Sequence, residues 1–149
     1  MFDTYEISNS TLAVIPINSN QTEVIEKFNH YIINKNCVKI IDDSCKFFGS
    51  SLDGRHDGTK NLIGVSYKPP IIVEESSEII FFPTNSVRNK DCIWISLKNL
   101  ERFHRDGGKT KIIFKNGVEI DLKVSYETIE NQVLRSTRLE SVLRNRKNF

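Results

Sequence analysis

The stretch that decides the fold runs from Thr110 to Leu122 and reads Thr-Lys-Ile-Ile-Phe-Lys-Asn-Gly-Val-Glu-Ile-Asp-Leu. Apolar and polar residues alternate around Lys115-Asn116-Gly117, a pattern typical of two half-buried strands joined by a tight turn. A two-residue loop would place apolar residues opposite polar ones, because side chains alternate between the faces of a sheet. We therefore predict a three-residue loop with Gly117 left-handed in a G1 bulge. In this register Phe114 pairs with Val118, Ile112 with Ile120, Thr110 with Leu122, and Lys111 lies beside Asp121.

Further strands are predicted wherever a short apolar run is bounded by Asn, Ser, Gly or Pro. They cover residues 5–7, 12–17, 21–28, 31–33, 38–41, 71–74, 78–82 and 93–95. The first two are expected to form an N-terminal hairpin. The predicted fold class is α+β, a predominantly antiparallel β-sheet with short central helices and a C-terminal helix or helix pair.

The two central helices are predicted from their capping residues. Asp42-Asp43-Ser44 offer N-cap oxygens to a short helix, which ends where Gly49 can adopt the left-handed conformation. Ser50-Ser51 cap a second helix, which is expected to end at Lys68-Pro69-Pro70. This helix contains two glycines, Gly54 and Gly58, which indicate that something large approaches its backbone, either a ligand or another protein segment.

Ser125 is predicted to cap a C-terminal helix with Ile129 and Val133 on one face. The apolar residues 139, 142 and 143 project from a different face, so the helix is expected to break near residues 135–138. A second helix would start there and either associate with another copy or dock on its own core. We expect one domain spanning residues 1–149, of which residues 125–149 form a helical, Arg-rich extension.

Composition excludes several classes of protein. The chain has 149 residues, 38% of them hydrophobic, and no apolar run approaches the roughly 18 residues needed to cross a bilayer. No secretory signal is visible, so we expect a soluble cytoplasmic protein without a membrane partner. No phosphate-binding glycine loop, zinc-binding motif or dinucleotide fingerprint occurs, and the three histidines show no ligand spacing. We therefore expect no enzyme, no metal and no cofactor.

The three cysteines, at positions 37, 45 and 92, are interpreted as reduced and mostly buried. Their odd number and wide spacing form no disulfide framework. A thiol enzyme centred on Cys45 is retained as an alternative, which would need a partner histidine.

Basic residues concentrate toward the C-terminus. Residues 1–60 carry 6 basic and 8 acidic side chains, whereas residues 61–149 carry 15 basic and 11 acidic ones. A second basic stretch, Ser44 to Lys60, combines cations with hydroxyls and glycines, which are the components of a phosphate-binding surface. The isoelectric point of about 8.4 is below the range typical of strongly basic nucleic-acid modules. The candidate DNA-binding residues are Lys46, Ser50, Ser51, Arg55, Lys60, Arg135 and Arg138.

Several blocks of the sequence resemble the ComK family of bacterial competence transcription factors. They are Ser44-Cys45-Lys46-Phe47-Phe48-Gly49-Ser50-Ser51, Gly54-Arg55, Gly58-Thr59, Lys68-Pro69-Pro70-Ile71, Phe82-Pro83-Thr84, Trp94-Ile95-Ser96, Phe114-Lys115-Asn116-Gly117, Ser125-Tyr126 and Glu130-Asn131-Gln132-Val133. Each block alone is unspecific, but together they follow the family's order from near Tyr5 to about Arg138. More weakly, residues 92–132 also resemble the β-rich LytTR DNA-binding domain.

The ComK resemblance implies a cytoplasmic transcriptional activator of DNA-uptake genes that binds paired A-rich and T-rich tracts of double-stranded DNA. It implies binding mainly through the minor groove and as a homo-oligomer, with RNA polymerase and a proteolytic adaptor as further partners. Longer family members carry a tail that binds the adaptor, whereas this sequence stops at Arg146-Lys147-Asn148-Phe149, which leaves adaptor-driven degradation open. The resemblance assigns no DNA contacts to single residues, so the seven candidates rest on physical reasoning.

One further alternative is retained. The Arg-rich C-terminal helices could dock a protein partner in place of DNA, which would make the chain a protein-interaction or regulatory module. An inactive or shortened competence-factor homologue would have this character.

Overall fold

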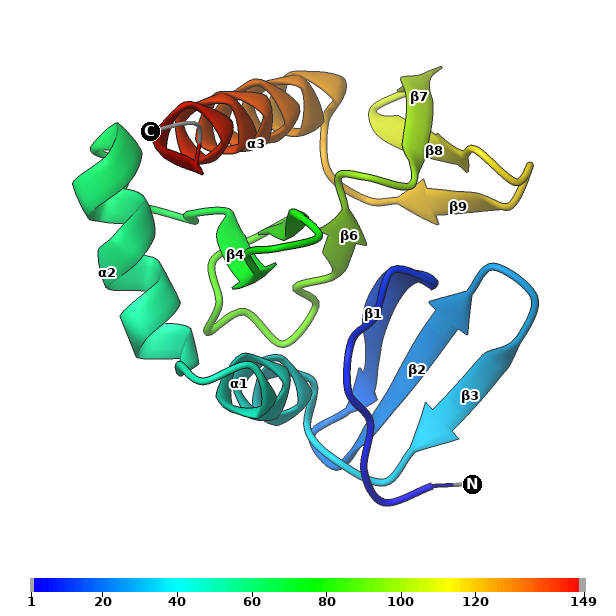
Figure 1. Ribbon diagram of the computed structural model, residues 1–149. Coiled ribbons are helices and arrows are strands. Elements are labelled where there is room, and N and C mark those ends of the chain that lie inside the picture. Colours follow the sequence, from blue (N-terminus) through cyan, green and yellow to red (C-terminus); the bar gives the residue numbers. More distant parts are fainter. Residues whose placement is uncertain (1, 148–149) are drawn as a thin grey trace.

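The computed structural model describes residues 2–147 and contains two antiparallel sheets and three helices (Figure 1). The larger sheet has the strand order β3-β2-β1-β6-β5-β4 and the smaller one β7-β8-β9. The strands of the larger sheet are β1 (Thr11–Asn18), β2 (Gln21–Glu26), β3 (His30–Ile33), β4 (Ile71–Glu74), β5 (Ile79–Pro83) and β6 (Trp94–Ser96). The remaining elements are β7 (Leu100–Asp106), β8 (Lys109–Phe114), β9 (Glu119–Leu122), α1 (Cys37–Phe47), α2 (Leu52–Ile63) and α3 (Tyr126–Lys147). This architecture confirms the predicted α+β class.

The strands β4, β5 and β6 of the larger sheet are buried on both faces. Neighbouring side chains of one strand point to opposite faces, so Phe81 packs in one core cluster and Phe82 in another. The first cluster includes the buried side of α1, whereas the second includes residues of the three-stranded sheet and Ile129 of α3. Leu139 and Leu143 of α3 pack on β4 and β5 in a third cluster. Burial on both faces explains why β5 is a continuous apolar run.

The hairpin of β8 and β9 has the predicted register. Ile112 pairs with Ile120, and the backbone amide of Phe114 donates to the Val118 carbonyl over 2.9 Å. Gly117 has a φ of +91°, the left-handed conformation that a G1 bulge requires. The prediction that fixed the sheet is therefore confirmed at the level of single residue pairs.

Three local predictions near the N-terminus were wrong. Residues 38–41 belong to α1 and not to a strand, and the N-cap is Asn36, whose Oδ1 accepts from Val38 N over 3.0 Å. Residues 5–7 form no strand; the hairpin joins β1 to β2 instead. The amide of Ile7 donates to Ser44 Oγ of α1 over 3.1 Å. Tertiary packing on α1 therefore replaces strand pairing here.

Helix α2 and strand β7 also differ from the prediction. Helix α2 ends at Gly64, which has a φ of +73°, before the predicted stop at residues 68–70. Strand β7 was not predicted, because its outward residues are polar and it is largely exposed. It is an edge strand of the three-stranded sheet and pairs with β8.

Helix α3 is continuous, so the predicted break near residues 135–138 was wrong. Its buried residues are Ile129, Gln132, Ser136, Leu139 and Leu143. Their spacing of three and four residues forms one stripe along a single helix. Two polar residues in the middle of the stripe interrupted the apolar pattern: Gln132 Nε2 donates to the Pro83 carbonyl over 2.7 Å, and Ser136 Oγ donates to the Gln132 carbonyl. The last two residues of the predicted extension, Asn148 and Phe149, lie outside the described residues.

Candidate nucleic-acid interface

Helix α2 is held in place through polar contacts at both ends. Ser51 is the predicted N-cap, and its Oγ accepts from Gly54 N over 3.0 Å. Asp42 Oδ1 of α1 accepts from the amide of Leu52 over 2.9 Å. Near the other end, the buried Thr59 donates through Oγ1 to the Pro70 carbonyl over 2.6 Å. These contacts fix the predicted phosphate-binding stretch between α1 and β4.

The two glycines of α2 have different surroundings. A Cβ at Gly54 would lie 2.8 Å from Ser50 Oγ and 3.2 Å from Ser51 Oγ, so the nearby group is the helix's own cap. A Cβ at Gly58 would meet no atom within 4 Å. Among the described residues, only the serines that precede the same helix lie close to Gly54, and no protein segment packs on Gly58.

The turn between β4 and β5 joins the two predicted basic regions. Arg55 Nη1 of α2 lies 3.2 Å from Glu75 Oε1, and Arg144 Nε of α3 lies 2.8 Å from Glu78 Oε2. Lys147 Nζ donates to the Glu75 carbonyl over 3.2 Å. Helices α2 and α3 also contact each other directly. The α2 part of the basic stretch and the C-terminal half of α3 therefore lie side by side.

Four of the seven candidate residues have intramolecular partners. Lys46 Nζ lies 3.1 Å from Asp42 Oδ2, and Arg135 Nη1 donates to the Tyr67 carbonyl over 3.0 Å. The Arg55 side chain is only 15% exposed and pairs with Glu75, and Ser51 Oγ caps α2. These four side chains are therefore oriented by the protein itself.

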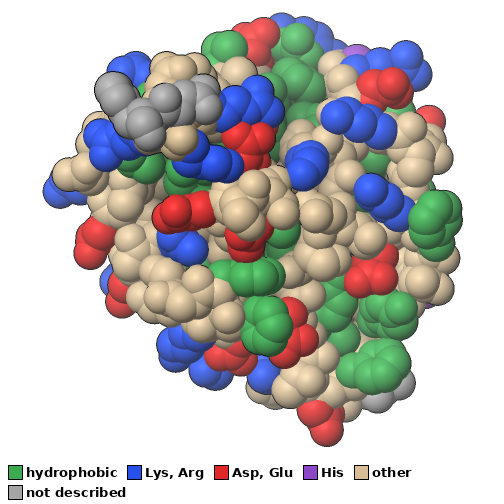
Figure 2. Space-filling model, viewed as in Figure 1, with side chains coloured by type: hydrophobic (Ala, Val, Ile, Leu, Met, Phe, Trp, Pro, Cys, Tyr) green, Lys and Arg blue, Asp and Glu red, His purple; other side chains and the backbone are tan. Residues whose placement is uncertain are grey.

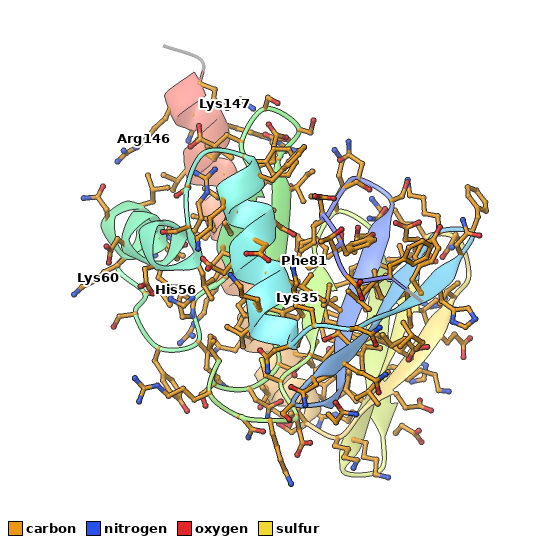
Figure 3. All side chains as sticks on the ribbon, turned by 90° about the horizontal axis from the view of Figure 1, so that it is seen from below. Lys35, His56, Lys60, Phe81, Arg146 and Lys147 are labelled. Atoms are coloured by element: carbon orange, nitrogen blue, oxygen red, sulfur yellow. The ribbon has the colours of Figure 1, made fainter. Side chains whose placement is uncertain are left out.

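The other three candidates are Ser50, Lys60 and Arg138. The residues Ser50, Arg55 and Glu75 line one open cavity of about 440 Å³ beside the start of α2. Lys60 and Arg138 are exposed and form no ion pair among residues 2–147. Arg146 is likewise exposed and without an ion-pair partner in the described part of the chain. Figure 3 shows Lys60 and Arg146 pointing away from the body of the protein.

Three cations near the end of α3 were not among the candidates. Arg144, Arg146 and Lys147 lie in its last turn and extend the basic surface. Their signal in the sequence was the basic run that begins after Leu134. Figure 2 shows Lys and Arg side chains around the C-terminal end of α3, with carboxylates interleaved among them. The surface is thus basic but not uniformly so.

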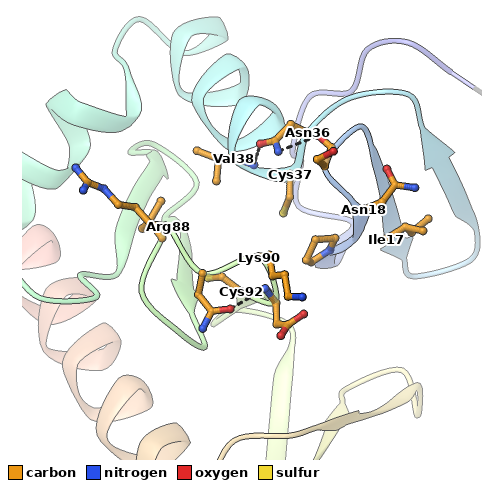
Figure 4. Close-up of a pocket in the computed structure, with 13 residues that line it drawn as sticks. Ile17, Asn18, Asn36, Cys37, Val38, Arg88, Lys90 and Cys92 are labelled. Carbon is orange, nitrogen blue, oxygen red and sulfur yellow. Dashed lines mark hydrogen bonds between the residues drawn. The ribbon is translucent and has the colours of Figure 1, made fainter.

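A larger cavity, of about 740 Å³, lies away from this surface (Figure 4). It is lined by the β1–β2 turn, the start of α1 and the loop that carries Arg88 and Lys90, and none of the seven candidates lines it. The buried thiols of Cys37 and Cys92 are part of its wall. Burial raises the pKa of Cys92 to about 11, so its thiol is protonated at neutral pH.

Cys45 lacks the surroundings of a nucleophile. Its side chain is fully buried, and burial raises its pKa to about 11. No hydrogen bond joins it to a histidine within the described chain. The expectation of reduced, buried cysteines agrees with the burial of all three. Separately, no helix among residues 2–147 is both long and apolar enough to span a membrane.

Comparison with known proteins identifies the family of the chain. The family model described as ComK protein matches residues 2–148. A curated relative from Bacillus subtilis (strain 168), described as "Competence transcription factor", is 36% identical over 148 residues, which cover 97% of this chain and 77% of the relative. No solved structure matches the chain. A match over nearly the whole length, together with this identity, shows that the chain belongs to the ComK family of competence transcription factors.

Proposed function

We propose that the chain binds double-stranded DNA and activates transcription of DNA-uptake genes. We propose further that it reads paired A-rich and T-rich tracts mainly through the minor groove, and that it acts in the bacterial cytoplasm, where the chromosome lies. The observation that carries this proposal is the family match over residues 2–148, since a competence transcription factor acts on DNA. The chain belongs to a family of transcription factors and is not an enzyme.

The basic surface of α3 supports the same proposal. From Leu134 to Lys147 the helix carries Arg135, Arg138, Arg144, Arg146 and Lys147 against Glu140 alone. A-tracts have a narrow minor groove, whose concentrated negative potential attracts Arg and Lys side chains. Contacts of this kind need no recognition helix, which agrees with an architecture dominated by two antiparallel sheets.

The charges on α2 indicate which end of the surface meets the phosphates. Asp53 and Asp57 are both exposed on α2, and their carboxylates repel DNA. Lys60, in contrast, lies near the end of the same helix and has no ion-pair partner among the described residues. We therefore centre the DNA contact on Lys60, Arg138 and Arg146. Lys46, Ser50, Ser51, Arg55 and Arg135 are proposed as flanking contacts.

Replacement of Lys60 or Arg138 by Gln should weaken binding to an A-tract/T-tract duplex and reduce the slope of log affinity against log salt. Each phosphate contact contributes about 0.9 to that slope. Fluorescence anisotropy titrations between 50 and about 200 mM salt measure both quantities. Lys123→Gln is the matched control, because Lys123 is exposed in the segment between β9 and the start of α3 and also lacks an ion-pair partner in the described chain. Slopes equal to that of Lys123→Gln would remove these residues from the interface.

We also propose that the chain forms a homo-oligomer, and that the contact between copies does not use the apolar stripe of α3. That stripe is buried within the same molecule, so the predicted choice between self-association and docking on its own core is resolved toward docking. Leu134 and Tyr67 are 64% and 67% exposed, and Arg135, which follows Leu134, donates to the Tyr67 carbonyl. We propose this patch as the contact between copies.

Sedimentation velocity of the full chain, with and without the duplex, tests the oligomer. We expect species larger than one copy, at least on DNA, and expect Leu134→Ser to shift them toward the monomer. A single copy bound per duplex at all concentrations would contradict the proposal. RNA polymerase and the proteolytic adaptor stay predicted partners.

A further inference from the structure

The β4–β5 turn, Glu74 to Glu78, binds cations from α2, from α3 and from the turn between β6 and β7. Its carboxylates pair with Arg55 of α2 and Arg144 of α3 over 3.2 and 2.8 Å. Its backbone carbonyls accept from Lys147 at Glu75 and Ser76, and from Lys98 at Ser77 over 2.8 Å. Figure 3 shows Lys147 lying against the body of the protein, whereas the neighbouring Arg146 points away. Four cations therefore converge on five residues.

The turn is built to present oxygen atoms. Glu74 uses its own carboxylate inside the turn, where it accepts from the amides of Ser76 and Ser77 over 2.7 and 2.8 Å. This leaves the carboxylates of Glu75 and Glu78 to pair with Arg55 of α2 and Arg144 of α3. Glu78 adopts a φ of +55°, a conformation that is uncommon for a residue other than glycine. Arg144 holds the pKa of Glu78 below its ordinary value, so that carboxylate is charged at neutral pH.

We propose that this turn is an internal competitor of the DNA backbone for the cations of α2 and α3. Arg55, Arg144 and Lys147 belong to the surface proposed above to bind DNA, and carboxylate and carbonyl oxygens take the positions that phosphate oxygens would take. Arginine binds both groups through the same planar donors. The turn thereby limits the number of protein cations that can contact phosphates and release the counterions bound to DNA. It therefore lowers the affinity of the protein for any duplex. This inference rests on the proposed DNA-binding function.

The competing pairs can be displaced. The Glu75 and Arg144 side chains are 60% and 57% exposed, so each ion pair has one member in solvent, where pairs are weak and screened by salt. The Glu78 side chain is 19% exposed, so Arg144 is the member of that pair that a phosphate reaches. A phosphate that approaches from solvent can therefore reach the exposed Arg144 and compete with Glu78 for it. Arg55 is the exception, because its side chain is only 15% exposed and must move outward to reach DNA.

The test compares isosteric neutral variants of the turn with a matched control. Glu75→Gln and Glu78→Gln each remove one competing charge and keep the side-chain shape. Glu127→Gln is the control, since Glu127 forms an exposed pair with Arg105 at the start of α3, away from the turn. All three variants change the net charge by the same amount. Thermal melting establishes that each is folded.

The measurement is the affinity of each variant for an A-tract/T-tract duplex as a function of salt. We expect the two turn variants to bind more tightly than wild type and to steepen the log–log slope by up to about 0.9, the value for one further phosphate contact. Glu127→Gln should change both quantities less. If Glu78→Gln unfolds, Glu75→Gln alone decides, because Glu75 is the more exposed carboxylate.

Two outcomes would overturn the inference, and only one of them would also overturn the proposed DNA-binding function. If wild type binds the duplex but the turn variants match Glu127→Gln, the turn does not compete, and the proposed function stands. If wild type and all variants fail to bind any duplex at low salt, the proposed function fails as well.

Discussion

Asp42 shows how a single carboxylate joins two helices. Its Oδ1 accepts from the first amide of α2, a donor that has no partner within that helix, and its Oδ2 pairs with Lys46. The hydrogen bond from Leu52, with the help of Lys46, holds the pKa of Asp42 below its ordinary value of 3.8. A carboxylate whose pKa is lower in the folded state than in the unfolded state stabilises the fold at any pH above its unfolded-state pKa. This contribution is lost as the pH falls through the folded-state pKa.

We therefore expect wild type to lose stability between about pH 5 and 3 more steeply than Asp42→Asn. At neutral pH the substitution should cost about 1 kcal/mol, because the asparagine oxygen still accepts from Leu52 but without charge. Urea unfolding at a series of pH values measures both effects. Parallel profiles of unfolding free energy against pH for the two proteins would show that Asp42 does not cause the pH dependence of stability.

At the scale of elements, the hairpin of β8 and β9 makes the sharpest prediction. Gly117 has a φ of +91°, and a Cβ there would meet no atom within 4 Å, so any cost of alanine comes from backbone conformation alone. Gly117→Ala should lower the free energy of unfolding by about 1–2 kcal/mol. Gly58→Ala is the natural comparison, because Gly58 lies inside α2 with the same open space. It should raise stability by about 0.5–1 kcal/mol. An unchanged melting temperature in Gly117→Ala would count against the bulge.

The elements also show what the sequence could and could not predict. The hairpin and the strands β4, β5 and β6 were predicted from local signals, because turn chemistry and apolar runs there agree with the fold. Residues 38–41 were assigned to a strand because Val and Ile favour strands locally, whereas the side chains of Ile40 and Ile41 pack in the core as part of a helix. In α3, Gln132 looked like an interruption, because the carbonyls that it binds lie about 50 and 64 residues away in sequence.

At the scale of the whole molecule, the candidate site was predicted in part. Its two basic stretches could be read from charge and composition, but their meeting depends on the β4–β5 turn, which no local pattern connects to either helix. The same turn explains why Arg55, a candidate DNA-binding residue, is largely buried. Pairing partners that are distant in sequence decide which cations face solvent, and these partners are visible only in the fold.

The DNA-binding proposal depends on a preference for the narrow minor groove of adenine–thymine tracts. The most direct test is the ratio of affinities of the wild-type chain for a duplex with an A-tract and a T-tract and for a GC-rich duplex of equal length, measured by anisotropy at several salt concentrations. Because phosphate contacts are common to both duplexes, we expect both affinities to fall steeply with salt and the A-tract/T-tract duplex to bind more tightly throughout. Equal affinities for the two duplexes, or no binding to either in dilute salt, would contradict the proposal.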